Sequence, residues 1–263
     1  MDTVFPSIAP GRVHRWGGAA LIVARRRDLH RAPVLSPAEE RVVRALPAWR
    51  QAEWTAGRLL AKHLVGAIVS APPHEVEILP RDDGSPYVVV SGSPVPALNV
   101  SISHTAGHVA AALAPRPVGV DLCETASADA VRRVADHALS PEELALMDTD
   151  RAEVMAGAWA LKEAAVKADR SGVFGTAPRR IAILGLRPPV LDGRRRAMAW
   201  QAGDAVLALV LADPAAPHCV GAPRSAGSCL SVEPLAVQVP VGQRARTSEG
   251  EMSGDGASSH LSW

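Results

Sequence analysis

The sequence predicts an α+β protein built from two similar halves. First, its segments recur in the same order about 100 residues later. Second, each half contains a helical pattern that starts with tryptophan and is followed by a strand-like run. Third, the repeats of solenoid proteins span about 20–50 residues, so this longer period indicates a duplicated unit instead. We therefore expect two copies of one α+β unit, related by a pseudo-twofold axis, with an active site in the cleft between the halves.

The matching segments define the expected strands and helices. Alternating or continuous apolar runs predict strands, and apolar residues spaced three and four apart predict helices. In order, the pairs are "ALIVA" (20–24) with "VGVDL" (118–122), "LSPAEERV" (35–42) with "LSPEELAL" (139–146), "WTAGRLLAKHL" (54–64) with "WALKEAAVKA" (159–168), "EVEIL" (75–79) with "RIAIL" (180–184), and "VAAALA" (109–114) with "AVLALVLA" (205–212).

Two of these segments carry a helix-start signal. Ser36 and Ser140 each precede a proline, and a glutamate follows three residues after each serine, at Glu39 and Glu143. This spacing predicts a capping box with proline at the first helical position.

The pattern divides the chain into three parts. Residues 1–115 form the first half, and residues 116–213 form the second half, which carries the expected metal site. Residues 214–263 have no sustained periodicity and are rich in Pro, Ser, Gly and Ala. We expect this last part to be a disordered tail.

The composition is typical of a globular protein, with 48% hydrophobic residues and a net charge of +1. A nucleic-acid partner is not expected, because there is no basic excess and tyrosine and phenylalanine, which stack on bases, total only three. The three cysteines have neither metal-ligand spacing nor a disulfide framework, which favours a reducing compartment. No signal peptide is visible, and no run reaches the roughly 20 apolar residues of a membrane span. The expected protein is cytoplasmic and monomeric, without a membrane partner.

The segment "WALKEAAVKA" contains two of the three lysines among the 28 basic residues. Glu163 and Lys167 are four residues apart and Trp159 lies one turn earlier, so all three share a helix face. One interpretation is a surface Glu–Lys pair, worth about 0.3–0.5 kcal/mol. We favour a functional pair, because the neighbours are apolar and because a flexible ammonium, which suits phosphate binding, replaces the usual arginine. The role of Lys162 stays open.

Asp121 interrupts the strand-like run "VGVDLCE" (118–124) with a charge. In isolation, an edge-strand aspartate that faces water is the commoner explanation. A buried carboxylate is costly unless it is paired or binds a metal, and Asp121 stands on the first strand of the second half, beside the junction. Cys123 should share the face of Asp121, and Glu124 should point to the opposite face.

A third polar group lies in "VSISHTAGHVAAAL" (100–113). Ser103 and His104 are adjacent there, and neighbouring side chains of an extended chain diverge, so they do not form a catalytic dyad. One interpretation is a strand end with a locally satisfied histidine. The other is a small cradle in which hydroxyl, imidazole and turn amides bind an anionic oxygen.

Taken in order, "GSP" (84–86), "SISHT" (101–105), "VGVD" (118–121) and "WALKEAAVKA" (159–168) resemble the motifs of 4′-phosphopantetheinyl transferases. The resemblance is to the surfactin-synthetase type, in which one chain contains two similar halves. It covers about residues 15–212 and includes "LSPAEE" and the "AGR" at 56–58. The pattern W-x-x-K-E-x-x-x-K is its most specific element.

This resemblance implies a reaction and its cofactors. Such an enzyme transfers the phosphopantetheine arm of coenzyme A to a serine of an apo acyl or peptidyl carrier protein, releases adenosine 3′,5′-bisphosphate and requires Mg²⁺. By position, Asp121 and Glu163 match the metal-binding carboxylates, and Glu163 also matches the proposed base for the incoming serine. Lys167 matches the lysine at the pyrophosphate. Ser103 and His104 match the pair that holds the 3′-phosphate.

The chain departs from that pattern at two positions. Cys123 stands where a second acid is frequent, and Ser85 stands where a lysine is frequent. Arg58 or Arg81 could supply the missing cation. Thiolate is a soft ligand and Mg²⁺ is a hard ion, so we expect two protein carboxylates at the metal and no sulfur.

Two alternatives remain open. The departures fit a catalytically weak paralogue that binds coenzyme A or a carrier protein without modifying it. A generic nucleotide-binding or structural α+β protein would make every motif match accidental. The motifs describe the coenzyme A side of the reaction, so the sequence does not identify the carrier.

Overall fold

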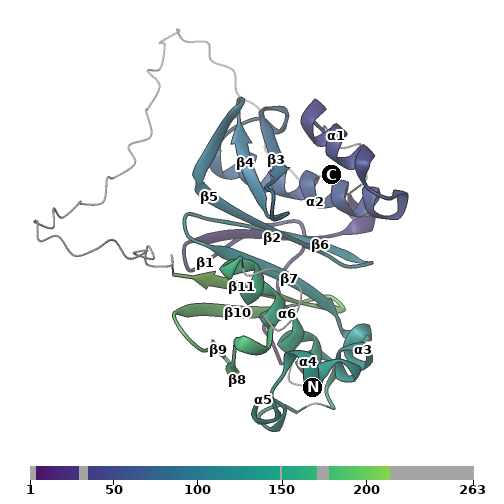
Figure 1. The fold of residues 1–263 in the computed structure, drawn as a ribbon, viewed down its shortest axis with the longest axis vertical. Helices are drawn as coiled ribbons and strands as arrows, with labels where there is room; N and C mark the ends of the chain where they lie inside the picture. Colours follow the sequence, from purple (N-terminus) through teal and green to yellow (C-terminus); the bar gives the residue numbers. More distant parts are fainter. Residues whose placement is uncertain (1–3, 30–34, 149, 171–177, 214–263) are drawn as a thin grey trace, which may run out of the picture. The chain divides into compact units, whose positions relative to one another are not determined.

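Two antiparallel sheets form the centre of the computed structural model, which describes residues 4–29, 35–148, 150–170 and 178–213 (Figure 1). The larger sheet has the strand order β1-β2-β6-β5-β4-β3 and the smaller has the order β10-β11-β7, with β8 and β9 as a separate hairpin. The strands are β1 (Val13–Trp16), β2 (Ala19–Arg25), β3 (Val76–Pro80), β4 (Pro86–Val90), β5 (Ser93–His104), β6 (His108–Ala114), β7 (Val118–Glu124), β8 (Ile183–Leu186), β9 (Pro189–Leu191), β10 (Arg195–Ala202) and β11 (Ala205–Ala212).

Two long helices and four shorter ones accompany the sheets in the described part of the chain. They are α1 (Pro37–Ala45), α2 (Ala48–Val69), α3 (Ala128–Arg133), α4 (Ala135–Ala138), α5 (Pro141–Ala145) and α6 (Ala152–Asp169). The two predicted capping boxes are confirmed at the starts of α1 and α5. The Ser36 hydroxyl accepts from the Glu39 N–H at 3.2 Å, and the Ser140 hydroxyl accepts from the Glu143 N–H at 3.2 Å.

Three apolar clusters show how these elements form layers (Figure 1). One cluster packs α2 on the outer face of the larger sheet and includes Leu60 and Val109. A second lies between the two sheets and includes Ala110 of β6 and Val120 of β7. A third packs α6 on the smaller sheet and includes Leu161. The layers are therefore helix, sheet, sheet, helix, and β7 has the larger sheet on one face and α6 on the other.

The helix α6 lies directly against β7 because residue 119 is glycine. A Cβ atom at Gly119 would lie 1.8 Å from the carbonyl oxygen of Ala164, far inside van der Waals contact. Even alanine at position 119 would therefore push the helix off the strand. This close approach places the helix of Glu163 and Lys167 beside the strand of Asp121.

A buried ion pair holds the long helix α2 in place. The ammonium of Lys62 on α2 lies 2.7 Å from the Glu39 carboxylate. The same carboxylate accepts the backbone N–H of Ile78 on β3 at 2.8 Å. Glu39 thus joins α1, α2 and the sheet edge.

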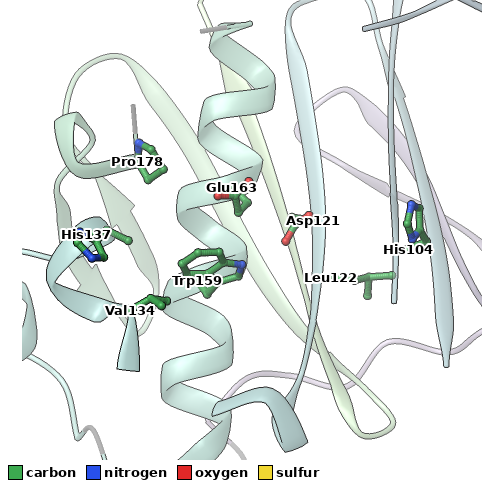
Figure 2. Close-up of a pocket in the computed structure, with 9 residues that line it drawn as sticks. His104, Asp121, Leu122, Val134, His137, Trp159, Glu163 and Pro178 are labelled. Carbon is green, nitrogen blue, oxygen red and sulfur yellow. The ribbon is translucent and has the colours of Figure 1, made fainter. Parts of the chain in front are cut away.

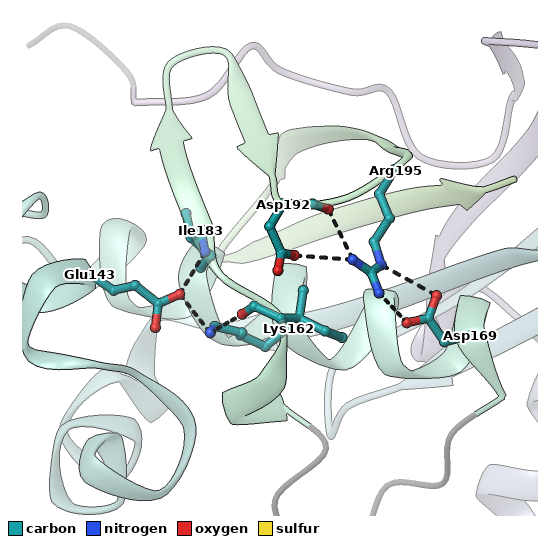
Figure 3. Close-up of polar contacts among 7 residues, drawn as sticks. Glu143, Lys162, Asp169, Ile183, Asp192 and Arg195 are labelled. Carbon is teal, nitrogen blue, oxygen red and sulfur yellow. Dashed lines mark hydrogen bonds and ion pairs between the residues drawn. The ribbon is translucent and has the colours of Figure 1, made fainter.

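A similar arrangement of contacts occurs on α6 (Figure 3). Lys162 is fully buried, and its ammonium lies 2.6 Å from the Glu143 carboxylate. Glu143 also accepts the backbone N–H of Ile183 on β8 at 2.6 Å. The role left open for Lys162 is therefore to anchor α6 to the segments that surround it.

The predicted α+β class is confirmed, with two differences in the extent of elements. The helix α2 begins at Ala48, six residues before the predicted start at Trp54. The strand expected at 180–184 begins at Ile183, because a 3₁₀ turn occupies Pro178–Arg180. The expected tail at 214–263 lies outside the described residues. Among the helices of the described ranges, none combines the length and the apolar character needed to cross a membrane.

Candidate active site

A pocket of about 450 Å³ opens beside β7 and α6 (Figure 2). It brings together four residues that the sequence singled out, namely His104 from the end of β5, Asp121 from β7, and Trp159 and Glu163 from α6. The full lining consists of His104, Asp121, Leu122, Val134, His137, Ala138, Trp159, Glu163 and Pro178. Trp159 and Glu163 face the same space, as their spacing of four residues predicts.

Asp121 is buried and paired, although it stands on an edge strand. Its residue is 7% exposed. Its Oδ1 atom accepts from the ammonium of Lys167 at 2.6 Å and from the hydroxyl of Ser103 at 2.7 Å. Among the residues that the structure describes, none donates a hydrogen bond to Oδ2. Asp121 is therefore held in one orientation by its first oxygen and presents the second to another ligand.

Two serines of β5 bond to the edge of β7 that has no neighbouring strand in its own sheet. An edge strand leaves backbone N–H groups without a neighbouring strand. The Ser101 hydroxyl accepts from the Val120 N–H at 3.0 Å, and the Ser103 hydroxyl accepts from the Leu122 N–H at 3.1 Å. The alternating Ser101 and Ser103 therefore join the two sheets, and the Ser103 hydroxyl both accepts from Leu122 and donates to Asp121.

Lys167 spans the same junction. Besides Asp121, its ammonium donates to the carbonyl oxygens of Val120 at 3.2 Å and of Ile102 at 3.4 Å. An ammonium has three donors and no acceptor, so all three can be used within the protein. Binding a phosphate would require Lys167 to exchange one of the two longer bonds.

Glu163 has an unusual protonation equilibrium. Burial and the negative charge of Asp121 raise the pKa of Glu163 to about 7, against the opposing effect of Lys167. A carboxylate with such a pKa is suited to accept a proton near neutral pH. The mutual repulsion of Glu163 and Asp121 also means that a cation between them would be favourable.

His104 lies in a group of charges that the sequence did not reveal. Its Nδ1 atom lies 3.7 Å from the Glu53 carboxylate, and the guanidinium of Arg26 lies 3.5 Å from the same side chain. Burial lowers the pKa of His104 and Glu53 raises it, while the charges of Lys167, Arg26 and Arg50 lower it further. Positive groups therefore gather around His104 from α6, from the end of β2 and from the first turn of α2.

Arg58 and Arg81, the expected substitutes for the missing lysine, lie elsewhere. The Arg58 Nε atom donates to the carbonyl oxygen of Ile78 at 3.2 Å, and its guanidinium stacks 4.3 Å from the Trp54 ring centroid. Burial lowers the pKa of Arg58 to about 10. The guanidinium of Arg81 lies 5.1 Å from the ring centroid of Tyr87. Neither arginine is among the described residues that line the pocket.

Cys123 shares the α6-facing side of β7 with Asp121, as strand alternation predicts, and packs in the apolar cluster there. Burial, with the charges of Asp121 and Glu124, raises the pKa of the Cys123 thiol to about 12. The thiol therefore stays protonated at neutral pH, and a neutral thiol is a poor ligand for a hard cation.

If the chain catalyses the transfer that its sequence resemblance implies, Cys123→Ala is expected to reduce the specificity constant for coenzyme A by less than about tenfold, or about 1.4 kcal/mol of transition-state stabilisation. The reason is that a neutral, buried thiol contributes packing rather than charge. Steady-state transfer assays at saturating Mg²⁺ measure this change. A folded but inactive Cys123→Ala protein would show that the sulfur has a direct role.

The donor set of the pocket fits Mg²⁺. No group of three or more His, Cys, Asp or Glu side chains that could hold a metal occurs within the described ranges. Asp121 and Glu163 nevertheless place two carboxylates on one pocket, and Mg²⁺ is commonly bound through one or two carboxylates together with substrate phosphates and water. A site of this kind would be completed by the substrate.

Sequence reasoning missed several residues around this pocket. Val134, His137 and Pro178 line it but belong to segments without a periodic or family pattern. Arg26 belongs to a run of three arginines that follows the strand-like segment "ALIVA". This cluster of positive charges at the end of a strand was the feature of the sequence that could have indicated an anion-binding residue.

One of three comparisons with known proteins, the match to a family model, covers part of this pocket. The model of the 4′-phosphopantetheinyl transferase superfamily matches residues 117–206, a range that contains Asp121, Glu163 and Lys167. A comparison with curated proteins finds no match. Among solved structures, a holo-(acyl-carrier-protein) synthase from Bacillus anthracis in complex with CoA (3′,5′-ADP) is similar, with 22% sequence identity and a TM-score of 0.31. The similarity covers 36% of this chain and 92% of that chain.

Proposed function

We propose that the protein transfers the 4′-phosphopantetheine arm of coenzyme A to a serine of an apo carrier protein. The observation that carries this proposal is the placement of Asp121 and Glu163 in one pocket, with Lys167 bound to Asp121. The family model supports it, because its match includes these three residues. In the reaction, the serine oxygen bonds to the phosphorus that bears pantetheine, the pyrophosphate bond breaks, and adenosine 3′,5′-bisphosphate leaves.

Phosphoryl transfer depends mainly on positioning and on neutralising charge. Asp121 and Glu163 are the residues that would hold Mg²⁺, which when bound would neutralise charge on the pyrophosphate. Lys167, held beside Asp121, adds a positive charge on the protein side. Asp121 in turn is oriented by Ser103. The proposed role of Ser103 is therefore mainly to orient Asp121, with any contact to the 3′-phosphate made through the turn that follows it.

Glu163 is the proposed base for the serine hydroxyl. Its pKa of about 7 allows a substantial ionised fraction at neutral pH together with enough basicity to accept a proton. Trp159, one turn earlier on α6, and Leu122 supply apolar walls beside it. These walls would restrict water next to the reacting serine.

The proposed 3′-phosphate site is the group around His104. Arg26 and Arg50 replace Arg58 and Arg81 as the candidate cations, because their charges act on His104. Charge-assisted bonds from arginine to phosphate are stronger than neutral ones.

Arg26→Gln and Arg50→Gln are each expected to raise the KM for coenzyme A about tenfold, which corresponds to about 1.4 kcal/mol. Neither should change the KM for 3′-dephospho-coenzyme A by more than about twofold, because that compound lacks the group they bind. Arg81→Gln serves as the matched control. A larger effect of Arg81→Gln than of the other two would contradict the assignment.

We also propose that the enzyme is of the surfactin-synthetase type, with two halves that arose by duplication. The matched ion pairs Glu39–Lys62 and Glu143–Lys162 support this, since each joins a capping glutamate, a long helix and a strand N–H. We further propose that the protein is a cytoplasmic monomer and that it uses Mg²⁺.

The test is incubation with coenzyme A, Mg²⁺ and a panel of apo fatty-acid, polyketide and peptide carriers, followed by intact-mass spectrometry. A gain of one phosphopantetheine on at least one carrier is expected. Coenzyme A binding without any mass change across the panel would favour the catalytically weak paralogue. The panel also identifies the carrier class.

A further inference from the structure

The helix α6 presents two rows of polar side chains that point in different directions. The site row consists of Trp159, Glu163 and Lys167. The anchor row consists of Lys162 and Asp169, which are seven residues, or about two turns, apart. At about 100° per residue, the two rows lie roughly a quarter to a third of a turn from each other around the helix axis.

The anchor row is fixed at both ends (Figure 3). Lys162 is bonded to Glu143 at 2.6 Å and also donates to the carbonyl oxygen of Ile181. Asp169 forms two bonds with the guanidinium of Arg195, at 2.6 Å and 3.3 Å. Arg195 is itself held by the Asp192 carboxylate at 3.0 Å. The Lys162 end of the row is therefore tied to α5 and to the segment just before β8, and the Asp169 end is tied to β10.

A buried ion pair is an unexpected choice for stability alone. Apolar side chains of similar volume are often as stabilising, or more so, because charges lose their hydration on burial. Lys162 is fully buried in a helix whose other buried residues are apolar or glycine. An ion pair with fixed partners has a preferred direction, whereas contacts between alanine side chains have none. The ion pair therefore resists rotation of the helix about its axis.

Such rotation would act directly on the site row. Side chains extend about 5–6 Å from a helix axis, so a rotation of about 10° moves them by about 1 Å. A displacement of about 1 Å can cost about 10²-fold in rate. We propose that Lys162 with Glu143, and Asp169 with Arg195, are positioning residues that set the rotation of α6 and so hold Glu163 and Lys167 at Asp121. This inference rests on the proposed function.

The chain offers a matched control for this idea. Glu39 and Lys62 form the same buried pair on α2, with the same capping box and the same strand N–H. The helix α2 carries no carboxylate that faces Asp121 in the pocket. Removing either pair should cost comparable stability, and only the pair on α6 should change the metal site.

The experiment compares Glu143→Gln/Lys162→Met with Glu39→Gln/Lys62→Met in the full-length chain. The thermal midpoints of both double variants should fall by similar amounts. The α6 variant should lose about 10- to 100-fold in kcat and require at least fivefold more Mg²⁺ for half-maximal rate. Because α2 carries Arg50 of the proposed 3′-phosphate site, both variants are assayed at saturating coenzyme A, where the α2 variant should stay within about twofold of the parent in both quantities.

A second readout does not need turnover. Electron paramagnetic resonance measures the dissociation constant of Mn²⁺ in the presence of coenzyme A. This constant should rise at least fivefold in the α6 variant and should not change in the α2 variant. If the α6 variant does not fold, Asp169→Asn breaks the exposed end of the same row and should raise the Mn²⁺ dissociation constant twofold or more. Equal effects of the two pairs, or unchanged Mn²⁺ binding in both α6 variants, would overturn the inference. A parent protein that binds Mn²⁺ but transfers nothing would instead refute the proposed function.

Discussion

Replacing Glu163 by glutamine is expected to reduce transfer by about 10³-fold or more while leaving the protein folded. The change keeps the size of the side chain but removes the proposed base and one of two metal-binding carboxylates, and loss of a base alone costs about 10²–10⁴-fold. Initial rates from the mass assay measure the loss. Glu153→Gln, on the first turn of the same helix, is the matched control and should retain full activity. Turnover of Glu163→Gln within threefold of the parent would contradict the assignment.

The same substitution should change how stability depends on pH. The folded-state pKa of Glu163, about 7, lies above its ordinary value of 4.5, so the folded protein binds this proton more tightly than the unfolded chain does. The contribution of Glu163 to stability is therefore present below pH 4.5 and is lost as the pH rises to about 7. Without metal, Glu163→Gln should gain thermal stability relative to the parent between pH 5 and pH 8. A constant difference between the two proteins over this range would show that Glu163 has an ordinary pKa.

Replacing Asp121 by asparagine is expected to reduce transfer by about 10²-fold or more, because a carboxylate at the charged transition state becomes neutral. The asparagine oxygen can still accept from Lys167 or Ser103, so the fold should persist. Asp121→Ala should in addition lower the free energy of unfolding by about 1–3 kcal/mol, since both donors lose their acceptor.

Chemical denaturation of the two Asp121 variants separates the loss of transfer activity from the loss of stability. Asp129→Asn is the control, because the Asp129 side chain is 81% exposed. This replacement should change neither the transfer rate nor the free energy of unfolding. Equal activity of Asp121→Asn and the parent would remove Asp121 from the metal site.

The sequence predicted local features of this fold well, for reasons that are themselves local. A capping box depends on residues three apart, so Ser36 and Ser140 could be recognised without a structure. The shared face of Trp159 and Glu163 follows from helical periodicity alone. The family resemblance added the expectation that Asp121 and Glu163 act together, and both line one pocket.

Partners across the fold could not be predicted in the same way. Ser103 was expected at the 3′-phosphate because its position matches the family pattern, and that expectation did not reveal its hydrogen bond to Asp121, a residue on another strand. The charges around His104 come from three elements, so no single stretch of sequence contains them. Arg58 was considered as a cation because of its charge, but the sequence did not show that its side chain is buried, lies over Trp54 one turn earlier on the same helix and donates to the carbonyl oxygen of Ile78.

The three lysines have a practical consequence for chemical labelling. Their side chains are 3% exposed at Lys62, 1% at Lys162 and 25% at Lys167. An amine-reactive ester added to the folded protein can therefore reach, among lysine side chains, essentially one position, and that position adjoins the pocket. The extent of acylation at Lys167, read by peptide mass spectrometry, becomes a direct measure of occupancy, since a bound ligand would shield it.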